Sequence, residues 1–196
     1  MQVYEFEFLA LRTMPPTDGI ALGAIAMFGF GRCAVLSAAV CQQVENSAAD
    51  PALLTITSVT NPGGASMAGQ GPNSLIQYQP LGYTSTVKLL AATLDNTQTL
   101  HSKWIDTAFQ TKSTVRITLA QPTQLASYIL VTSSDVPRRD PISWDLYSID
   151  SNNNRILVDS RRAIAPPPRR GPPSIWFIGP FSPFWHISPL TYIPLS

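Results

Sequence analysis

The sequence predicts an all-β protein, an antiparallel β-sandwich or jelly roll, on the basis of three observations. Short runs of alternating or β-branched residues recur along the chain, turn-forming residues separate them, and helical periodicity is weak. A length of 196 residues favours one domain with a real apolar core over two very small domains. No internal repeat is visible, so a repeat architecture is not expected.

The first expected element is a strand over residues 3–12. Aromatic side chains at positions 4, 6 and 8 would line one face, and acidic side chains at positions 5 and 7 the other. Residues 19–41 are apolar enough to suggest a membrane span, but four glycines and Arg32 instead favour two buried strands joined by a turn at residues 29–31. Further strands are expected at residues 53–59, 114–119, 127–132, 144–149 and 155–159, and a short helix at residues 87–94.

Charge is scarce and unevenly distributed. Charged residues make up 13% of the chain and the formal net charge is +1, which argues against a protein that coats nucleic acid. A hydrophobic content of 44% excludes a disordered polyampholyte. Residues 51–87 and 171–196 contain no Asp, Glu, Lys or Arg. These two stretches are therefore expected to lie against protein rather than in water.

The second uncharged stretch is also rich in proline and aromatic residues. We expect residues 179–196 to form an extended arm that packs on its own domain or on a neighbour. The side chains expected to bind a partner are Arg169, Arg170, Trp176, Phe181, Phe184, Trp185 and Tyr192. The proline run at residues 166–168 would turn the arginines on either side of it, Arg161 and Arg162 included, outward, which suits an acidic partner surface, a phosphate or an anionic lipid. A merely solvated basic face is the alternative.

Four short sequence blocks follow one another in a recognisable order. They are residues 61–64 (NPGG), 71–76 (GPNSLI), 102–106 (SKWID) and 127–148, which include TSSDVPRRDPISWDLYS. Together they resemble the discoidin-like, coagulation-factor type C domains, whose fold is the galactose-binding-like jelly roll. The resemblance implies such a domain over residues 1–178, with an insertion around residues 77–94, followed by the arm.

The resemblance also implies a candidate metal site and a candidate binding loop. In many relatives an Asp of the region around the insertion helps to hold a structural calcium ion, and Asp95 with Asn96 could supply oxygen ligands here. No other cofactor is expected. The residues of the candidate ligand or partner loop are Trp104, Asp106, Arg138, Arg139 and Asp140.

Packing and turn chemistry predict structural roles for these residues. The tryptophans at positions 104 and 144 are expected in the core. Asp140 precedes a proline and is expected to cap the amides of a turn with its carboxylate. Arg139 is expected to form an ion pair with Asp106 or Asp135 rather than to clamp a ligand, because a partly buried guanidinium requires a carboxylate.

The sequence contains no set of residues suited to catalysis. His101 and His186 are its only histidines, and it has neither a nucleophile elbow in a strand-to-helix context nor a phosphate-binding glycine loop. We therefore expect a protein that is not an enzyme. The leading hypothesis is a structural or scaffold subunit that docks onto other protein subunits of a larger assembly, such as a virus particle or an organelle complex. A glycan-binding, lectin-like module is the alternative.

The N-terminal residues bear on location. Two acids occur where a signal peptide would need a basic region. An intracellular location, or one within a large particle, is therefore favoured, with no membrane span and no nucleic-acid partner expected.

Overall fold

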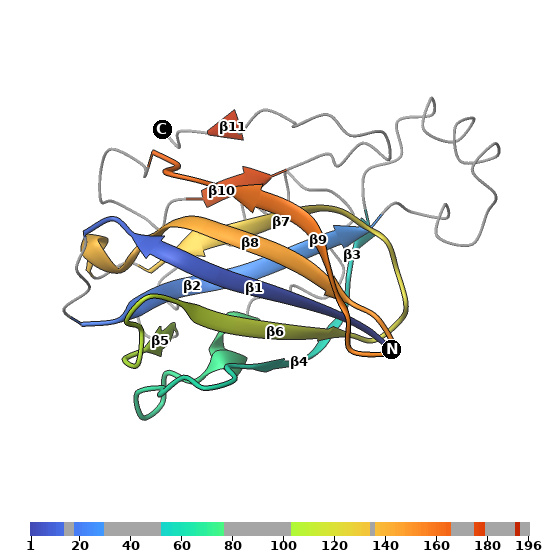
Figure 1. Ribbon diagram of the computed structural model, residues 1–196, viewed down its shortest axis with the longest axis horizontal. Coiled ribbons are helices and arrows are strands. Elements are labelled where there is room, and N and C mark those ends of the chain that lie inside the picture. Colours follow the sequence, from blue (N-terminus) through green and yellow to red (C-terminus); the bar gives the residue numbers. More distant parts are fainter. Residues whose placement is uncertain are drawn as a thin grey trace.

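Two antiparallel β-sheets face each other in this protein (Figure 1). The computed structural model describes residues 1–13, 18–29, 52–76, 103–133, 136–165, 175–178 and 191–192. The prediction of an all-β sandwich is confirmed, and the arrangement is compatible with a jelly roll. The expected insertion at residues 77–94, with its helix, and most of the expected arm lie outside the described residues.

The first sheet has five strands in the order β4-β6-β1-β8-β9. The bounds of these strands are Gln2–Leu11 for β1, Ile56–Thr60 for β4, Ser113–Leu119 for β6, Pro141–Ile149 for β8 and Arg155–Arg161 for β9. β1 lies at the centre, because it pairs with β6 on one side and with β8 on the other. β4 and β9 are the edge strands of this sheet.

The second sheet has six strands, in the order β11-β10-β7-β2-β3, with β5 also paired to β2. Their bounds are Ile20–Gly29 for β2, Ala52–Leu53 for β3, Trp104–Asp106 for β5, Leu125–Thr132 for β7, Ile175–Ile178 for β10 and Thr191–Tyr192 for β11. Two short 3-10 helices, η2 (Pro72–Ile76) and η3 (Pro137–Arg139), complete the described elements. The C-terminal strands β10 and β11 extend this sheet beyond β7, so two residues of the expected arm pair into the sheet.

The alternation of β1 places its aromatic residues in the core. Tyr4, Phe6 and Phe8 are buried, and the Phe6 ring stacks on Phe8 with 5.8 Å between centroids. Phe6 also meets Tyr128 of β7 edge-on at 5.1 Å, which is a favourable aromatic geometry between the two sheets. The predicted division of β1 into an aromatic and an acidic face is confirmed.

β2 is buried along both of its faces. Its side chains at Leu22 and Met27 belong to the core between the sheets, whereas Ala24 and Phe28 belong to a separate apolar cluster. The first of the two strands expected in residues 19–41 is therefore confirmed, and the second falls outside the described residues. In the part of the chain that the structure describes, no helix is long and apolar enough to cross a membrane.

The core between the sheets closes around two tryptophans. Trp104 of β5 and Trp144 of β8 both have 0% exposure, which confirms their predicted place in the core. The Trp104 ring lies 6.1 Å from the Phe8 ring in a tilted arrangement. Burying such large rings supplies much of the apolar area that holds a small sandwich together.

The pattern of the sequence does not predict β5 or β10. These strands have three and four residues, which is too few for an alternation to be recognised. β9 also continues to Arg161, beyond the expected end at residue 159. Its burial pattern is irregular because a register shift interrupts its pairing with β8.

Candidate functional site

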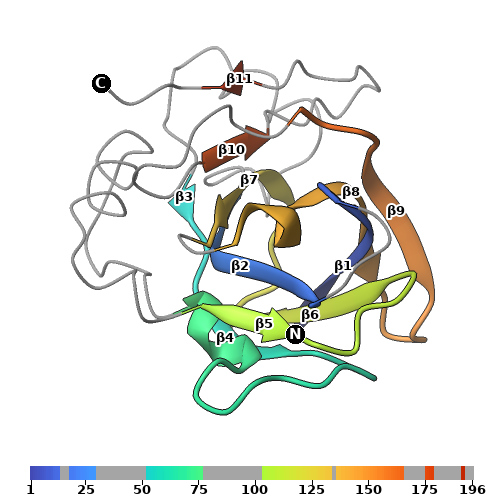
Figure 2. The same cartoon turned by 90° about the vertical axis from the view of Figure 1, so that its left-hand side faces the viewer.

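Loops from both sheets meet at one end of the sandwich, the end that faces the viewer in Figure 2. They follow β1, β4, β5 and β7 along the chain. Such loop clusters on a rigid sandwich commonly carry binding residues. Four residues of the predicted binding loop belong to this end: Asp106, Arg138, Arg139 and Asp140. The fifth, Trp104, lies in the core behind it.

Asp106 holds two of these loops together. Its Oδ1 accepts hydrogen bonds from the backbone N–H groups of Ala65, at 2.8 Å, and Ala108, at 2.9 Å. Its Oδ2 accepts hydrogen bonds from Ser113 Oγ, at 2.5 Å, and Asn61 Nδ2, at 3.2 Å. Because the residue is only 2% exposed and its carboxylate already accepts four donors, Asp106 fixes the loops in place and does not present its charge to a ligand.

The NPGG block forms the turn that Asp106 anchors. The Gly64 N–H donates to the Asn61 carbonyl at 3.2 Å, and Gly63 has a φ of +75°, which favours glycine. A Cβ on Gly64 would overlap the Asn61 amide group. That amide group in turn donates to the carbonyl of Thr114 on β6, at 2.8 Å. Gly63 is therefore favoured by its backbone conformation, and Gly64 leaves room for the Asn61 side chain.

Asp18 is the partner of both loop arginines. Its Oδ2 lies 2.9 Å from Arg138 Nη2 and 3.2 Å from Arg139 Nη2. Arg139 does form an ion pair, but the expectation that Asp106 is the partner was wrong, because the four donors on Asp106 belong to its own loops. The other expected partner, Asp135, lies outside the described residues. Hydrogen bonding to Asp18 raises the pKa of the Arg138 guanidinium.

Asp140 joins the β7–β8 loop to the end of β1. Its backbone N–H donates to the Pro137 carbonyl at 3.1 Å, and its own carbonyl accepts from the Arg12 N–H at 2.9 Å. The Asp140 carboxylate lies 3.8 Å from the Arg12 guanidinium. The backbone of Asp140 thus helps to close the turn, and its carboxylate faces the Arg12 guanidinium. Capping of turn amides by this carboxylate stays a prediction.

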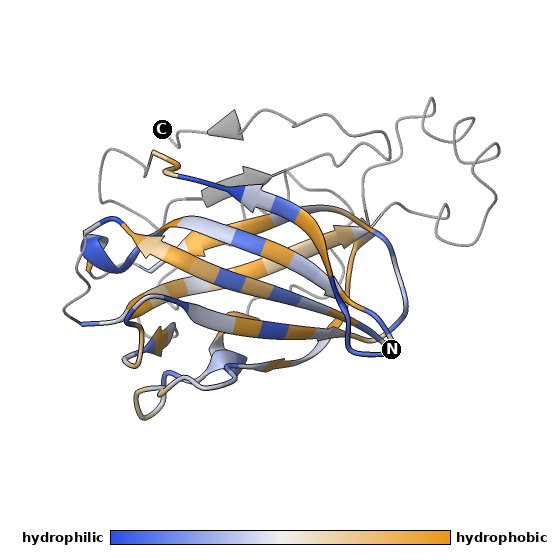
Figure 3. Cartoon of the chain, viewed as in Figure 1, coloured by the Kyte–Doolittle hydropathy of each residue, from blue (hydrophilic) through white to orange (hydrophobic). Residues whose placement is uncertain are grey.

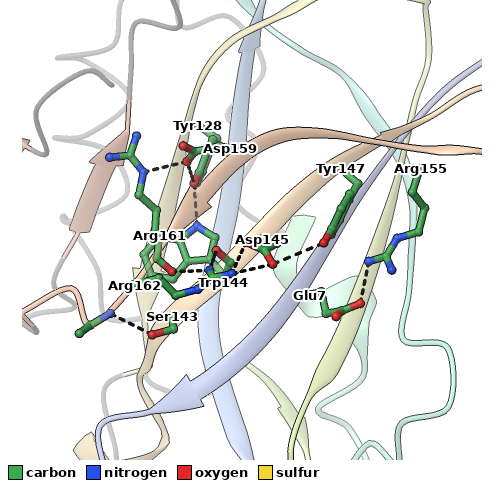
Figure 4. A network of polar contacts seen from close by, with 11 residues as sticks. Glu7, Tyr128, Ser143, Trp144, Asp145, Tyr147, Arg155, Asp159, Arg161 and Arg162 are labelled. Atoms are coloured by element: carbon green, nitrogen blue, oxygen red, sulfur yellow. Dashed lines mark hydrogen bonds and ion pairs between the residues drawn. The ribbon is translucent and has the colours of Figure 1, made fainter. Parts of the chain in front are cut away.

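A buried polar network that the sequence did not predict connects the two sheets (Figure 4). Trp144 Nε1, on β8, donates to the Tyr128 hydroxyl, on β7, at 2.7 Å. The same hydroxyl donates to Asp159 Oδ2, on β9, at 2.6 Å. Arg161 Nε donates to that carboxylate oxygen at 2.9 Å. These four residues fasten the edge strand β9 to the opposite sheet.

Burial is the main cause that raises the pKa of Tyr128 well above 10.0, and the negative charge of Asp159 raises it further. The hydroxyl therefore stays protonated and donates to Asp159 throughout the ordinary pH range. A tyrosine with this environment is a stable structural donor and would be a poor general base.

The outer face of the five-stranded sheet carries an ionic network. The Glu5 carboxylate lies 2.6 Å from Arg116 Nη2 and 3.0 Å from Arg155 Nε. Glu7 lies 2.6 Å from Arg155 Nη2, and the Arg155 guanidinium also lies 3.8 Å from the centroid of the Tyr147 ring. Figure 3 shows the resulting alternation of hydrophilic and hydrophobic residues along the strands of this sheet. The face is polar, and its charges neutralise one another.

Arg161 and Arg162 are engaged within the domain. Arg161 is 7% exposed and is bonded to Asp159. Arg162 donates to Asp145 Oδ2 at 2.9 Å and to the Trp144 carbonyl at 3.0 Å. The expectation that the guanidinium group points outward was wrong for Arg161, which is bound by Asp159. Arg162 is also bound by a carboxylate, but its side chain is 53% exposed, so its binding to an acidic partner stays a prediction.

On β2 and β7, the side of the six-stranded sheet that faces away from the core between the sheets carries buried apolar residues. A cluster on β2 and β7 comprises Ala24, Phe28, Ile129 and Val131, with Ala26 and Leu53 packed against it. Phe28 and Ile129 are 1% and 3% exposed. The register pairs Ala24 with Val131 and Ala26 with Ile129, so the cluster runs across both strands. We call this cluster the apolar face.

Several predicted residues lie beyond the description of side chains. Asp95, Asn96, Arg169, Arg170, Phe181, Phe184 and Trp185 fall outside the described residues, and Trp176 and Tyr192 are described only as members of β10 and β11. In the described ranges no three His, Cys, Asp or Glu side chains gather as metal ligands would. The calcium prediction rests on residues outside these ranges and stays a prediction.

The fold and this end of the molecule define a β-sandwich of two antiparallel sheets with an internally bonded loop cluster. No family model, curated protein or solved structure matches the chain. The resemblance to discoidin-like domains is therefore supported only at the level of an all-β sandwich.

Proposed function

We propose that this protein is a non-enzymatic structural subunit, built on a discoidin-like domain, that docks into a larger assembly of other protein subunits. The observation that carries the proposal is the contrast between the two outer faces. One is ionic and neutralised within the sheet, and the other is apolar. Phe28, Ile129 and Val131 on this second side are already buried within the domain. The proposal therefore places the docking surface on the uncharged C-terminal stretch that joins the molecule there, because stable assemblies use apolar, weakly charged surface.

The carboxylates support the same proposal. Each carboxylate in the described part of the chain has a hydrogen bond or an ion pair within the domain, and these residues are Glu5, Glu7, Asp18, Asp106, Asp140, Asp145, Asp150 and Asp159. Carboxylates that are used in this way position strands and loops. A catalytic acid or base would instead need access to a substrate.

The docking side is proposed to be that of the six-stranded sheet. The uncharged C-terminal stretch joins the molecule here, because β10 pairs with β7 and β11 pairs with β10. The aromatic residues expected to bind a partner, such as Phe181, Phe184 and Trp185, belong to the same stretch of sequence. Aromatic side chains contribute a large share of the binding energy at protein interfaces.

The test is co-purification from the native source. A chain without residues 179–196, and a full-length chain with Phe181, Phe184 and Trp185 replaced by Ala, should remain folded by circular dichroism and leave the assembly. The triple variant keeps Thr191 and Tyr192, so it separates loss of the aromatic side chains from loss of β11. Met67→Ala is the control, because this side chain is 46% exposed and lies in the loop after β4. The control chain should remain bound to the assembly. A deleted chain that still co-purifies would contradict the proposal.

The glycan-binding alternative has less support in the described residues. The large apolar side chains exposed there are Met1, Met67, Ile156 and Leu157. None of them is aromatic, whereas sugar sites commonly stack a ring on the sugar. A glycan array probed with the purified chain tests this alternative. Binding that is lost in Arg138→Ala, with no complex in native extracts, would favour it over the structural role.

A further inference from the structure

The edge strand β9 exposes two large apolar side chains next to each other. Ile156 is 56% exposed and Leu157 is 53% exposed, in a domain whose other apolar strand residues are mostly buried. Figure 2 shows β9 at the outer margin of the five-stranded sheet, with no strand beyond it in the order of that sheet. Exposed edges with apolar side chains are templates for strand pairing.

The positions of the two side chains indicate how they would be covered. Ile156 is paired with Ser148 and Leu157 with Tyr147, so the two neighbours point to opposite faces of the sheet. A partner lying on one face would cover only one of them. A strand added in the plane of the sheet would cover both, and it would also pair with the backbone groups on the side of β9 that no described strand occupies.

Contacts within the domain fix both ends of β9 in an extended conformation. At its start, the β8–β9 turn is closed by Asp150, whose Oδ1 accepts from the N–H groups of Asn152 and Asn154, each at 2.8 Å. At its end, Asp159 is bonded to Tyr128 of the opposite sheet. Little conformational entropy remains to be lost when a second strand binds.

We propose that β9 is a self-association edge, at which two copies of this chain pair antiparallel through residues 155–157. The residue that would sit on the two-fold axis is Ile156, opposite its own copy, with Leu157 opposite Arg155 of the second copy. This register avoids Val158, the extra residue at the register shift with β8, which turns toward the core.

Charge favours a second copy as the occupant. An isologous contact brings identical residues together, so an unneutralised charge at the edge would repel itself. The one charged residue of the pairing stretch, Arg155, is already bound by Glu5 and Glu7 at 3.0 and 2.6 Å. In this register Ile156 meets the Ile156 of the second copy, an apolar contact, and Leu157 lies beside the aliphatic part of the Arg155 side chain of the second copy.

Sedimentation of the purified full-length chain from low micromolar to millimolar concentration tests the proposal. The wild-type chain should show a reversible monomer–dimer equilibrium. The double variant Ile156→Lys, Leu157→Lys should remain monomeric, because lysine at an edge opposes pairing. Ser58→Lys places the same charge on an exposed position of the opposite edge strand, β4, and should dimerise like the wild type.

Amide hydrogen exchange at residues 155–157 supplies a second measurement. Protection there should rise with protein concentration in the wild type and stay constant in the double variant, whose fold is checked by its melting curve. A wild-type chain that is monomeric at all concentrations would overturn the proposal. So would a dimer that survives in the double variant, or one that Ser58→Lys disrupts equally.

Discussion

The two sheets of this sandwich differ in the side chains on the sides that face away from the core between them. The five-stranded sheet covers its outer side with paired ions, such as Glu5 with Arg116 and Arg155, whereas the six-stranded sheet carries Phe28, Ile129 and Val131 in the equivalent position. Among the described residues, the ion pairs named above lie on the outer side of the five-stranded sheet, and the cluster on the other side of the domain is apolar. Because Phe28, Ile129 and Val131 are already buried, the surface proposed to contact other protein on that side is the uncharged C-terminal stretch that joins the sheet there.

The largest effect should come from placing the same charge on each face. Ile129→Lys puts an ammonium group at a position that is 3% exposed and should lower the free energy of unfolding by about 3 kcal/mol or more, because a buried charge without a partner is costly. Thr118→Lys, on the face of β6 that also carries Arg116, should change it by less than about 0.5 kcal/mol. Urea unfolding of both variants measures the contrast, and equal losses would mean that the two faces do not differ.

The next effect concerns the network that ties the sheets together. Tyr128→Phe removes the hydroxyl that accepts from Trp144 and donates to Asp159. It should lower the free energy of unfolding by about 1–3 kcal/mol, because the fully buried Trp144 N–H loses this acceptor and Asp159 loses this donor. Urea unfolding is again the measurement, with Tyr147→Phe, whose hydroxyl makes only a long 3.4 Å contact, as the control. A loss no larger than that of the control would exclude a stabilising role for the network.

The raised pKa of Tyr128 predicts how the free energy of unfolding changes at alkaline pH. The pKa of Tyr128 is raised in the folded state, so the folded chain keeps a proton that the unfolded chain releases above pH 10.0. The contribution of Tyr128 to the free energy of unfolding is fully present below that pH. It decreases as the pH rises above it, because the unfolded state then binds fewer protons than the folded state. Tyr128→Phe should flatten this decline in unfolding experiments across the alkaline range. An unchanged decline would assign it to other groups, such as Tyr4, whose pKa burial also raises.

A smaller effect is expected within the ionic face itself. Glu5→Gln removes the carboxylate shared by Arg116 and Arg155, whose side chains are 39% and 37% exposed. Because solvent screens these guanidinium groups, the substitution should lower the free energy of unfolding by about 1 kcal/mol at low salt and by less in concentrated salt. Unfolding at two ionic strengths checks this. A loss that does not change with salt would show that Glu5 acts through packing rather than through charge.

Local pattern was sufficient to predict much of the fold. The alternation of β1 indicates both of its faces correctly, and the large tryptophans at positions 104 and 144 are correctly expected in the core. Strands of two to four residues, such as β3, β5 and β10, are too short for periodicity to reveal. They exist because neighbouring long strands offer unpaired backbone groups, which is a property of the assembled sheet.

The partners of the polar residues were harder to predict for the same reason. Arg139 was expected to need a carboxylate, but that Asp18 supplies one depends on how the loops after β1 and β7 meet. The contact between Asp159 and Tyr128 joins different sheets, and no spacing within the sequence indicates it. Residue type predicts that a buried charge will be paired, and only the folded arrangement determines the partner.

The most direct test of the proposed structural role compares amide hydrogen exchange of the purified chain with that of the chain in its native complex. The account predicts added protection in β7, β10 and β11 of the six-stranded sheet and in the uncharged C-terminal stretch, with exchange unchanged at β1 and β6. Added protection confined to β4 and β9, the edge strands of the five-stranded sheet, would contradict the account. So would a chain that is monomeric in native extracts.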